Sequence, residues 1–118
     1  MRCIIAGGRE ITSYLYVENA IKQCPWYYKI TEIVSGTARG VDSLGEHWAY
    51  RNDLLIKRFA PDWDKFGKAA GPLRNMEMAK YAEALIAIPG AGPGTFNMVD
   101  VAKQCNLQIY VYFPFEKS

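Results

Sequence analysis

The chain has 118 residues, of which 50% are hydrophobic and 22% charged, and its net charge is +2. This composition fits one ordinary globular domain over residues 1–118 and excludes a disordered chain. No apolar run approaches the roughly 20 residues that span a bilayer. A charge of +2 is too small to indicate nucleic acid by itself. Cys3, Cys24 and Cys105 are scattered, which fits free thiols in a reducing compartment, so we expect a cytoplasmic protein without membrane attachment.

Short apolar runs alternate with helical patterns along the chain. The expected strands are residues 2–6, 30–34, 54–59, 84–88 and 108–113. The expected helices begin after Thr12 or Ser13 as N-cap, after Gly40, at 71–72 and after Pro93, and residues 60–70 form a long connection. This alternation predicts an α/β, Rossmann-like, doubly wound parallel sheet of about five strands, in the order 3-2-1-4-5 with helices on both faces. Expected core residues include Ile4, Ile5, Val34, Leu44, Ile56, Ile86, Ile88, Val99 and Val111.

Small-residue loops follow the first, second and fourth expected strands. Ligands of such sheets bind beyond the carboxyl ends of the strands, at the point where the strand order reverses. Glycine loops that lead into helices offer unpaired backbone N–H groups to anions, and arginine binds two phosphate oxygens at once. The expected ligand-binding residues are Gly7, Gly8, Arg9, Ser35, Gly36, Thr37, Arg39, Gly40, Asp42, Lys68, Arg74, Asn75, Pro89, Gly90, Gly92, Gly94 and Thr95.

Other polar and aromatic residues leave alternatives open. Trp63 either stacks on a base or closes over the core. His47, the one histidine, is expected on a helix surface, so neither a Ser/His/Asp arrangement nor a metal site is expected. The dinucleotide-binding pattern GxGxxG is absent from the first loop, and the phosphate-binding pattern GxxxxGK[ST] is absent from the whole sequence. No cofactor is expected.

Four segments together resemble the SLOG superfamily, and most closely its small YspA-like branch. They are Ala6-Gly7-Gly8-Arg9, Ser35-Gly36-Thr37-Ala38-Arg39-Gly40-Val41-Asp42, the segment 67–78 with Arg74-Asn75-Met76-Glu77-Met78, and Pro89-Gly90-Ala91-Gly92-Pro93-Gly94-Thr95. The superfamily also contains the DNA-processing protein DprA and the LOG phosphoribohydrolases. The resemblance implies a Rossmann-like domain that binds nucleotides or nucleotide-derived ligands, with a sensor among the roles it allows, and it suggests a homo-oligomer.

One position departs from the LOG pattern. The LOG glycine loop, PGGxGTxxE, ends in a catalytic glutamate, and Met98 stands at that place here. Methionine cannot act as a base or stabilise a cationic sugar. Arg74 is retained and Glu77 is a nearby carboxylate, so these two are the candidate catalytic residues, with Asp42 as another carboxylate. Whether the protein is an enzyme stays open. A LOG-like hydrolase of the N-glycosidic bond of nucleoside monophosphates is the first alternative to binding, and DprA-like single-stranded DNA binding is the second.

Overall fold

The computed structural model describes residues 1–92 and 94–113, and five strands in these residues form one sheet. The strands are β1 (Arg2–Gly7), β2 (Glu32–Ser35), β3 (Leu55–Arg58), β4 (Ala84–Ile88) and β5 (Gln108–Val111). They lie in the order β3-β2-β1-β4-β5, and every neighbouring pair is parallel. The predicted doubly wound α/β fold is therefore confirmed, including its strand order.

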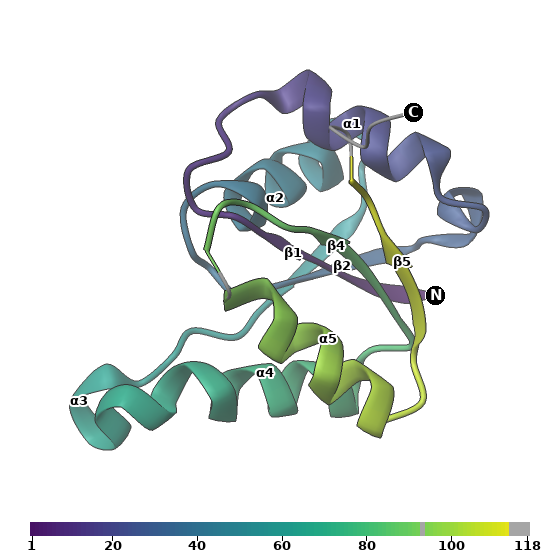
Figure 1. The fold of residues 1–118 in the computed structure, drawn as a ribbon. Helices are drawn as coiled ribbons and strands as arrows, with labels where there is room; N and C mark the ends of the chain where they lie inside the picture. The colour runs from purple at the N-terminus through teal and green to yellow at the C-terminus, as the bar shows by residue number, and fades with distance from the viewer. Residues whose placement is uncertain (93, 114–118) are drawn as a thin grey trace.

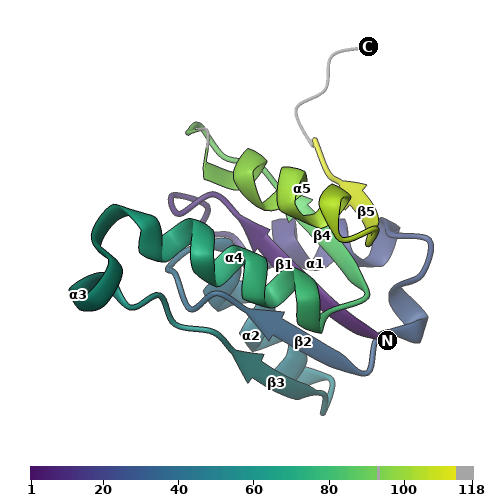
Figure 2. The same cartoon turned by 90° about the horizontal axis from the view of Figure 1, so that it is seen from below.

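Helices cover both faces of the sheet (Figure 1, Figure 2). On one face lie α1 (Tyr14–Gln23) and α2 (Val41–Arg51), and on the other lie α4 (Ala70–Tyr81) and α5 (Gly94–Gln104). The described residues also contain the short α3 (Trp63–Phe66) and two 3-10 turns, η1 (Tyr27–Lys29) and η2 (Gly67–Ala69). In both views α3 projects from the body of the molecule at the side where the strands end.

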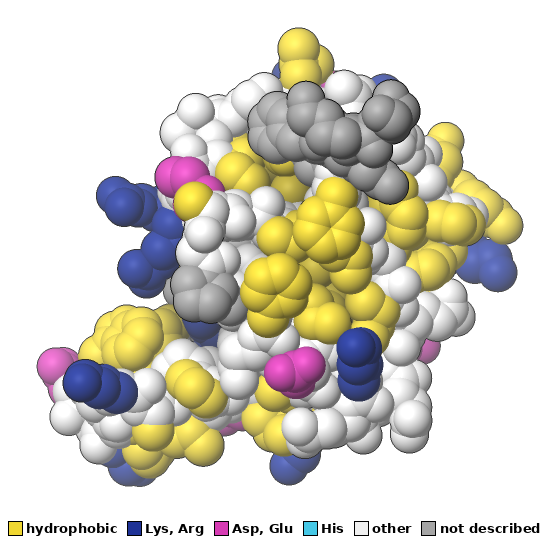
Figure 3. Space-filling view, in the orientation of Figure 1, with side chains coloured by type: hydrophobic (Ala, Val, Ile, Leu, Met, Phe, Trp, Pro, Cys, Tyr) yellow, Lys and Arg dark blue, Asp and Glu magenta, His cyan; other side chains and the backbone are white. Residues whose placement is uncertain are grey.

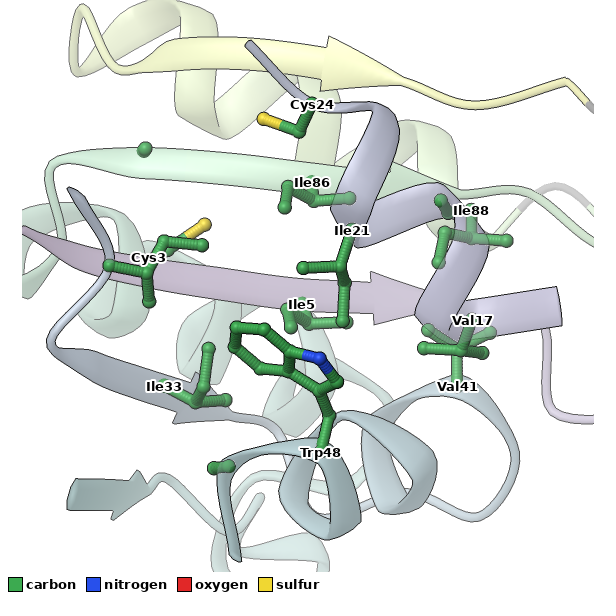
Figure 4. Packing of buried hydrophobic residues seen from close by; sticks show 14 residues of the cluster. Cys3, Ile5, Val17, Ile21, Cys24, Ile33, Val41, Trp48, Ile86 and Ile88 are labelled. Atoms are coloured by element: carbon green, nitrogen blue, oxygen red, sulfur yellow. The ribbon is translucent and has the colours of Figure 1, made fainter. Parts of the chain in front are cut away.

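Alternating residues of the central strands fill two separate cores. Cys3 and Ile5 of β1 and Ile86 of β4 pack beneath α1 and α2 (Figure 4). Ile4 of β1 and Leu85 of β4 belong to the second core, beneath α4 and α5. Successive side chains of a strand point to opposite faces, so a strand that is covered on both faces needs an uninterrupted apolar run. This requirement explains why the sequence pattern of these strands predicted the sheet correctly.

Three predicted core residues, Leu44, Ile56 and Val111, are only half-buried. Ile56 lies in β3 and Val111 in β5, and each of these strands has a neighbouring strand on one side only. Leu44 lies at the margin of the core beneath α2, where it packs against the buried residues without being enclosed by them. An apolar run therefore predicts a strand, but it does not distinguish an edge strand from a central one.

The helix boundaries refine the sequence prediction. Ser13 caps α1, because its hydroxyl oxygen accepts a hydrogen bond from the Tyr16 amide at 3.3 Å. The expected connection over residues 60–70 contains α3, where Asp62 accepts from the Lys65 amide at 3.1 Å, and α4 already begins at Ala70. The prediction that residue 93 opens the last helix lies outside the described residues. Among residues 1–92 and 94–113, no helix is long and apolar enough to cross a bilayer.

Candidate functional site

A cavity of about 230 Å³ lies at the carboxyl edge of the sheet. β1 and β4 are neighbours, but the chain continues from β1 towards β2 and from β4 towards β5, on opposite sides. This is the reversal of strand order at which open α/β sheets bind ligands. The cavity is lined by the loops that follow β1, β2 and β4 and by residues of α2, α3, α4 and α5.

Gly8 forms hydrogen bonds at the cavity wall to two other segments, the end of β4 and the start of α2. Its amide donates to the Ile88 carbonyl oxygen at 3.0 Å, and its own carbonyl oxygen accepts from the Val41 amide at 3.2 Å. Gly40 approaches the same carbonyl closely, since a Cβ on Gly40 would lie 2.3 Å from the Gly8 oxygen, and its φ is +79°. Only glycine fits a left-handed conformation against a backbone atom without strain. The loop after β2 is thereby fixed against the loop after β1.

Thr37, in the same loop, has a φ of 67°. A β-branched residue in the left-handed region is an outlier, and such residues concentrate at functional sites. The Thr37 amide donates to the buried hydroxyl of Ser35 at 3.1 Å, which holds the turn. The turn presents Ala38 to the cavity, whereas the Thr37 side chain is exposed.

Asp42 brings a buried carboxylate to the cavity wall. It lies in the first turn of α2 and is only 6% exposed. One carboxylate oxygen accepts from the Ala38 amide at 3.2 Å. Burial raises the pKa of Asp42 from 3.8 to about 6, against the lowering effects of the Ala38 amide, the Arg74 charge and the Gly7 amide. Asp42 therefore changes its charge close to neutral pH.

The side chain of Arg74 reaches from α4 to the loop after β2. Its guanidinium donates to the Gly36 carbonyl oxygen, and its Nε donates to the Asn75 side-chain oxygen at 2.9 Å. The Asn75 side-chain nitrogen donates in turn to the Asn97 side-chain oxygen on α5 at 2.8 Å. Burial lowers the pKa of Arg74, while Asp42 raises it and Arg9 lowers it. An arginine stays protonated in proteins, so the result is a fixed positive charge at the cavity wall.

The Glu10 carboxylate contacts the glycine loop that follows β4. Its Oε2 accepts a hydrogen bond from the Ala91 amide at 2.5 Å. A Cβ on Gly90 would lie 2.1 Å from the same oxygen, so the Glu10 side chain would have to move away from a larger residue at this position. The Ala91 amide lowers the pKa of Glu10, and the charge of Arg39 adds to this effect. Glu10 also borders a wider, mostly apolar groove of about 980 Å³ that includes Tyr16 and Phe96.

The cavity brings together about half of the predicted site residues. Those lining it are Gly7, Gly8, Arg9, Asp42, Arg74, Asn75, Gly92, Gly94 and Thr95. Those outside its lining are Ser35, Gly36, Thr37, Arg39, Gly40, Lys68, Glu77, Pro89 and Gly90. Several of the second group act indirectly, through the hydrogen bonds and close contacts described above. Glu77 is exposed on α4, so the geometry does not support a catalytic role for it.

The cavity also has lining residues that the sequence prediction did not include. They are Ala6, Glu10, Ala38, Trp63, Met78 and Met98. Met98 is buried in the wall at the place where LOG enzymes carry glutamate, so the wall is apolar there. No group of three His, Cys, Asp or Glu side chains that could hold a metal ion occurs in the described part of the chain.

Fold and cavity together define the class: a Rossmann-like α/β protein with its candidate ligand site at the reversal of strand order. A model of the YspA, cpYpsA-related SLOG family matches residues 1–66, which is more than half of the chain. The chain belongs to this family. The matched segment contains the first three strands, while Arg74 and the glycine loop after β4 lie beyond it.

Two further proteins are similar to this chain, one in sequence and one in fold. Gene 61 protein of Mycobacterium phage D29 is 31% identical over 84 residues, which are 65% of this chain and 67% of that protein. The structure of DNA processing protein A (DprA) from Streptococcus pneumoniae superposes with a TM-score of 0.73 at 17% identity, over 93% of this chain and 49% of that one. The chain thus spans about half the length of the DprA chain, and the likeness shows a shared fold.

Proposed function

We propose that the protein binds a nucleotide or a nucleotide-derived ligand in this cavity, with a phosphate held between Arg9, Arg74 and the glycine loop. The observation that carries this proposal is that two guanidinium groups and the glycine loop line one cavity at the reversal of strand order. Arginine and backbone N–H groups are the donors that phosphate oxygens require. Membership of the SLOG family supports a binding role related to nucleotides or nucleic acid.

The contact between Glu10 and the glycine loop supports the same ligand chemistry. The Ala91 amide donates to a carboxylate oxygen, which has the charge and acceptor geometry of a phosphate oxygen. The loop is thus suited to an oxyanion. Since Met98 takes the place of the LOG glutamate, binding without cleavage, as in a sensor, is the simplest role for the site.

The test compares two exposed arginines at the same edge of the sheet. Arg9 lines the cavity and Arg39 does not. In calorimetric titrations with AMP, Arg9→Ala should weaken binding about 10- to 150-fold, the equivalent of one lost hydrogen bond to a charged group. Arg39→Ala should keep nearly the parent affinity. Both variants should keep the parent melting temperature without ligand, because both side chains are exposed. Equal losses in the two variants, or no binding by the parent protein, would refute the proposed site.

A second candidate function is hydrolysis of the N-glycosidic bond of a nucleoside monophosphate, and Asp42 favours it. Its carboxylate lines the cavity with Arg74, and burial raises its pKa to about 6, in the range where general bases operate. Incubation with AMP and chromatography of free adenine tests this candidate. Release of base that disappears in Asp42→Asn would establish hydrolysis, and binding without release would leave the sensor role.

A further inference from the structure

Trp63 is an exposed tryptophan in the lining of the cavity. Its side chain lies on α3, which projects from the body of the molecule, and it is 51% exposed. It also lines the cavity. Figure 3 shows hydrophobic side chains gathered over this projecting arm. The structure thus excludes the alternative in which Trp63 closes over the core, and leaves an indole face at a ligand cavity.

Packing places one edge of the indole ring against α4. A Cβ on Gly71 of α4 would lie 3.5 Å from Trp63 Cη2, so the outer edge of the indole lies against this buried glycine at ordinary contact distance. Gly71 leaves room for the ring beside α4. Phe66, on the same short helix, is 44% exposed but does not line the cavity. The two aromatic residues of α3 therefore differ in their relation to the site.

The size of the cavity limits what it encloses. Cavities for drug-sized ligands measure about 300–1,000 Å³, and this one measures about 230 Å³. A cavity of this size takes the phosphate and sugar of a nucleotide more readily than the whole molecule. With the phosphate at Arg9 and Arg74, the base extends towards the exposed part of the lining, to which Trp63 belongs.

We infer that Trp63 is a stacking platform for the base of the bound nucleotide. This inference rests on the proposed function and adds how the base is held. Every base has a π face, so stacking discriminates weakly among bases, whereas contacts to base edges would select one of them. The site therefore takes nucleoside phosphates as a class, and the phosphate and sugar supply most of the selectivity.

The test separates the base from the rest of the ligand. Calorimetric titrations use ribose 5-phosphate, AMP and UMP on the parent protein, Trp63→Leu, Trp63→Phe and Phe66→Leu. The parent should bind AMP about 5- to 150-fold more tightly than ribose 5-phosphate, which is the range of one stacked base. Trp63→Leu should remove this difference without changing the affinity for ribose 5-phosphate. Trp63→Phe should restore part of it, and Phe66→Leu should keep all of it.

Each outcome decides between the two claims. Equal affinities of the parent for AMP and ribose 5-phosphate would refute the stacking role while leaving the phosphate site intact. The stacking role would also be refuted if Trp63→Leu still bound AMP more tightly than ribose 5-phosphate. If the parent binds neither compound, the proposed function fails and the stacking role fails with it. AMP should also quench the fluorescence of the parent but not that of Trp63→Leu, which retains Trp26 and Trp48.

Discussion

At the scale of single residues, two carboxylates determine the electrostatics of the cavity. Asp42 is buried in its wall and Glu10 is exposed at its rim. The cavity therefore combines negative groups with the positive charges of Arg9 and Arg74. Each carboxylate predicts a measurable effect, one on stability and one on binding.

Asp42 should make the stability of the protein depend on pH. Its pKa is raised from 3.8 to about 6 in the folded protein, so the folded state binds this proton more tightly than the unfolded chain. The contribution of Asp42 to stability is therefore fully present below the unfolded pKa and lost as pH rises through the folded pKa. The loss amounts to roughly 3 kcal/mol.

Asp42→Asn should remove this loss, because asparagine keeps an acceptor for the Ala38 amide but does not ionise. Urea denaturation of the parent and the variant at several values between pH 4 and pH 7 measures the effect. The stability of the variant relative to the parent should rise by roughly 3 kcal/mol across this interval. A difference that stays constant with pH would show that Asp42 ionises normally.

Glu10 lines the cavity and should repel an incoming phosphate. Glu10→Gln removes the negative charge and should raise the affinity for AMP, because like charges a few ångströms apart repel each other. Glu77→Gln is the matched control, since Glu77 is exposed and outside the cavity. Unchanged affinity in Glu10→Gln, measured by calorimetric titration, would mean that the phosphate does not lie near Glu10.

These residues also show where prediction from the sequence ends. The glycines and arginines of the site were predictable, because these residue types in a loop directly after a strand indicate an anion site wherever the rest of the fold lies. Glu10 and Asn97 were not, because their roles depend on which residues face them across the fold. For Trp63 the sequence left two alternatives open, stacking on a base or closing over the core. Glu10 meets the glycine loop 81 residues further along the chain, and no local pattern encodes such a pairing.

At the scale of elements, the spacing of apolar residues determined which helices and strands could be predicted from the sequence. The central strands β1 and β4 contain uninterrupted apolar runs, and α1, α2 and α5 have apolar residues at helical spacing, so these elements were predicted correctly. The helix α3 has four residues, which is too short for a helical repeat to appear. Its N-cap, Asp62, was part of a segment predicted as a connection. The element that carries Trp63 therefore became visible only in the structure.

The loop between β2 and α2 should tolerate little change at Gly40. Gly40→Ala forces a side chain into a left-handed conformation and against the Gly8 carbonyl oxygen, so it should lower stability by about 2–5 kcal/mol. Gly92→Ala is the control, because a Cβ there would meet no described atom within 4 Å. Denaturation in urea measures both variants. A small loss in Gly40→Ala would mean that the loop moves away from Gly8 at little cost.

At the scale of the whole molecule, the sheet separates two cores and leaves one edge for the cavity. The first core lies beneath α1 and α2 and the second beneath α4 and α5. The hydrogen bonds of Arg74, Asn75 and Asn97 cross from the loop after β2 to α4 and α5 at that edge. Met78 and Met98 belong to the second core and also line the cavity, so the core and the candidate site share part of their walls. Arg9 is exposed, so it can be changed without disturbing the core. A cytoplasmic location and a homo-oligomeric state stay predictions.

The small net charge of the chain gives little support to DprA-like binding of single-stranded DNA. The net charge is +2, and on the face in Figure 3 the Lys and Arg side chains form small groups without a continuous basic track between them. A strand-binding protein needs a continuous basic track with stacking aromatics. Arg9 and Arg74 line the cavity, and Trp63 is its one aromatic lining residue in the described part of the chain.

Binding of an oligonucleotide should therefore show only a weak dependence on salt. Each phosphate contact to a single strand contributes about −0.7 to the slope of log K against log salt concentration. Two arginines in the cavity predict a slope of about −1.4 for oligothymidylate, measured by fluorescence anisotropy between low and moderate salt. AMP should compete with the oligonucleotide, because both would place a phosphate at Arg9 and Arg74. A slope steeper than about −4 would require six or more contacts, and together with binding that AMP does not displace it would establish a separate strand-binding surface.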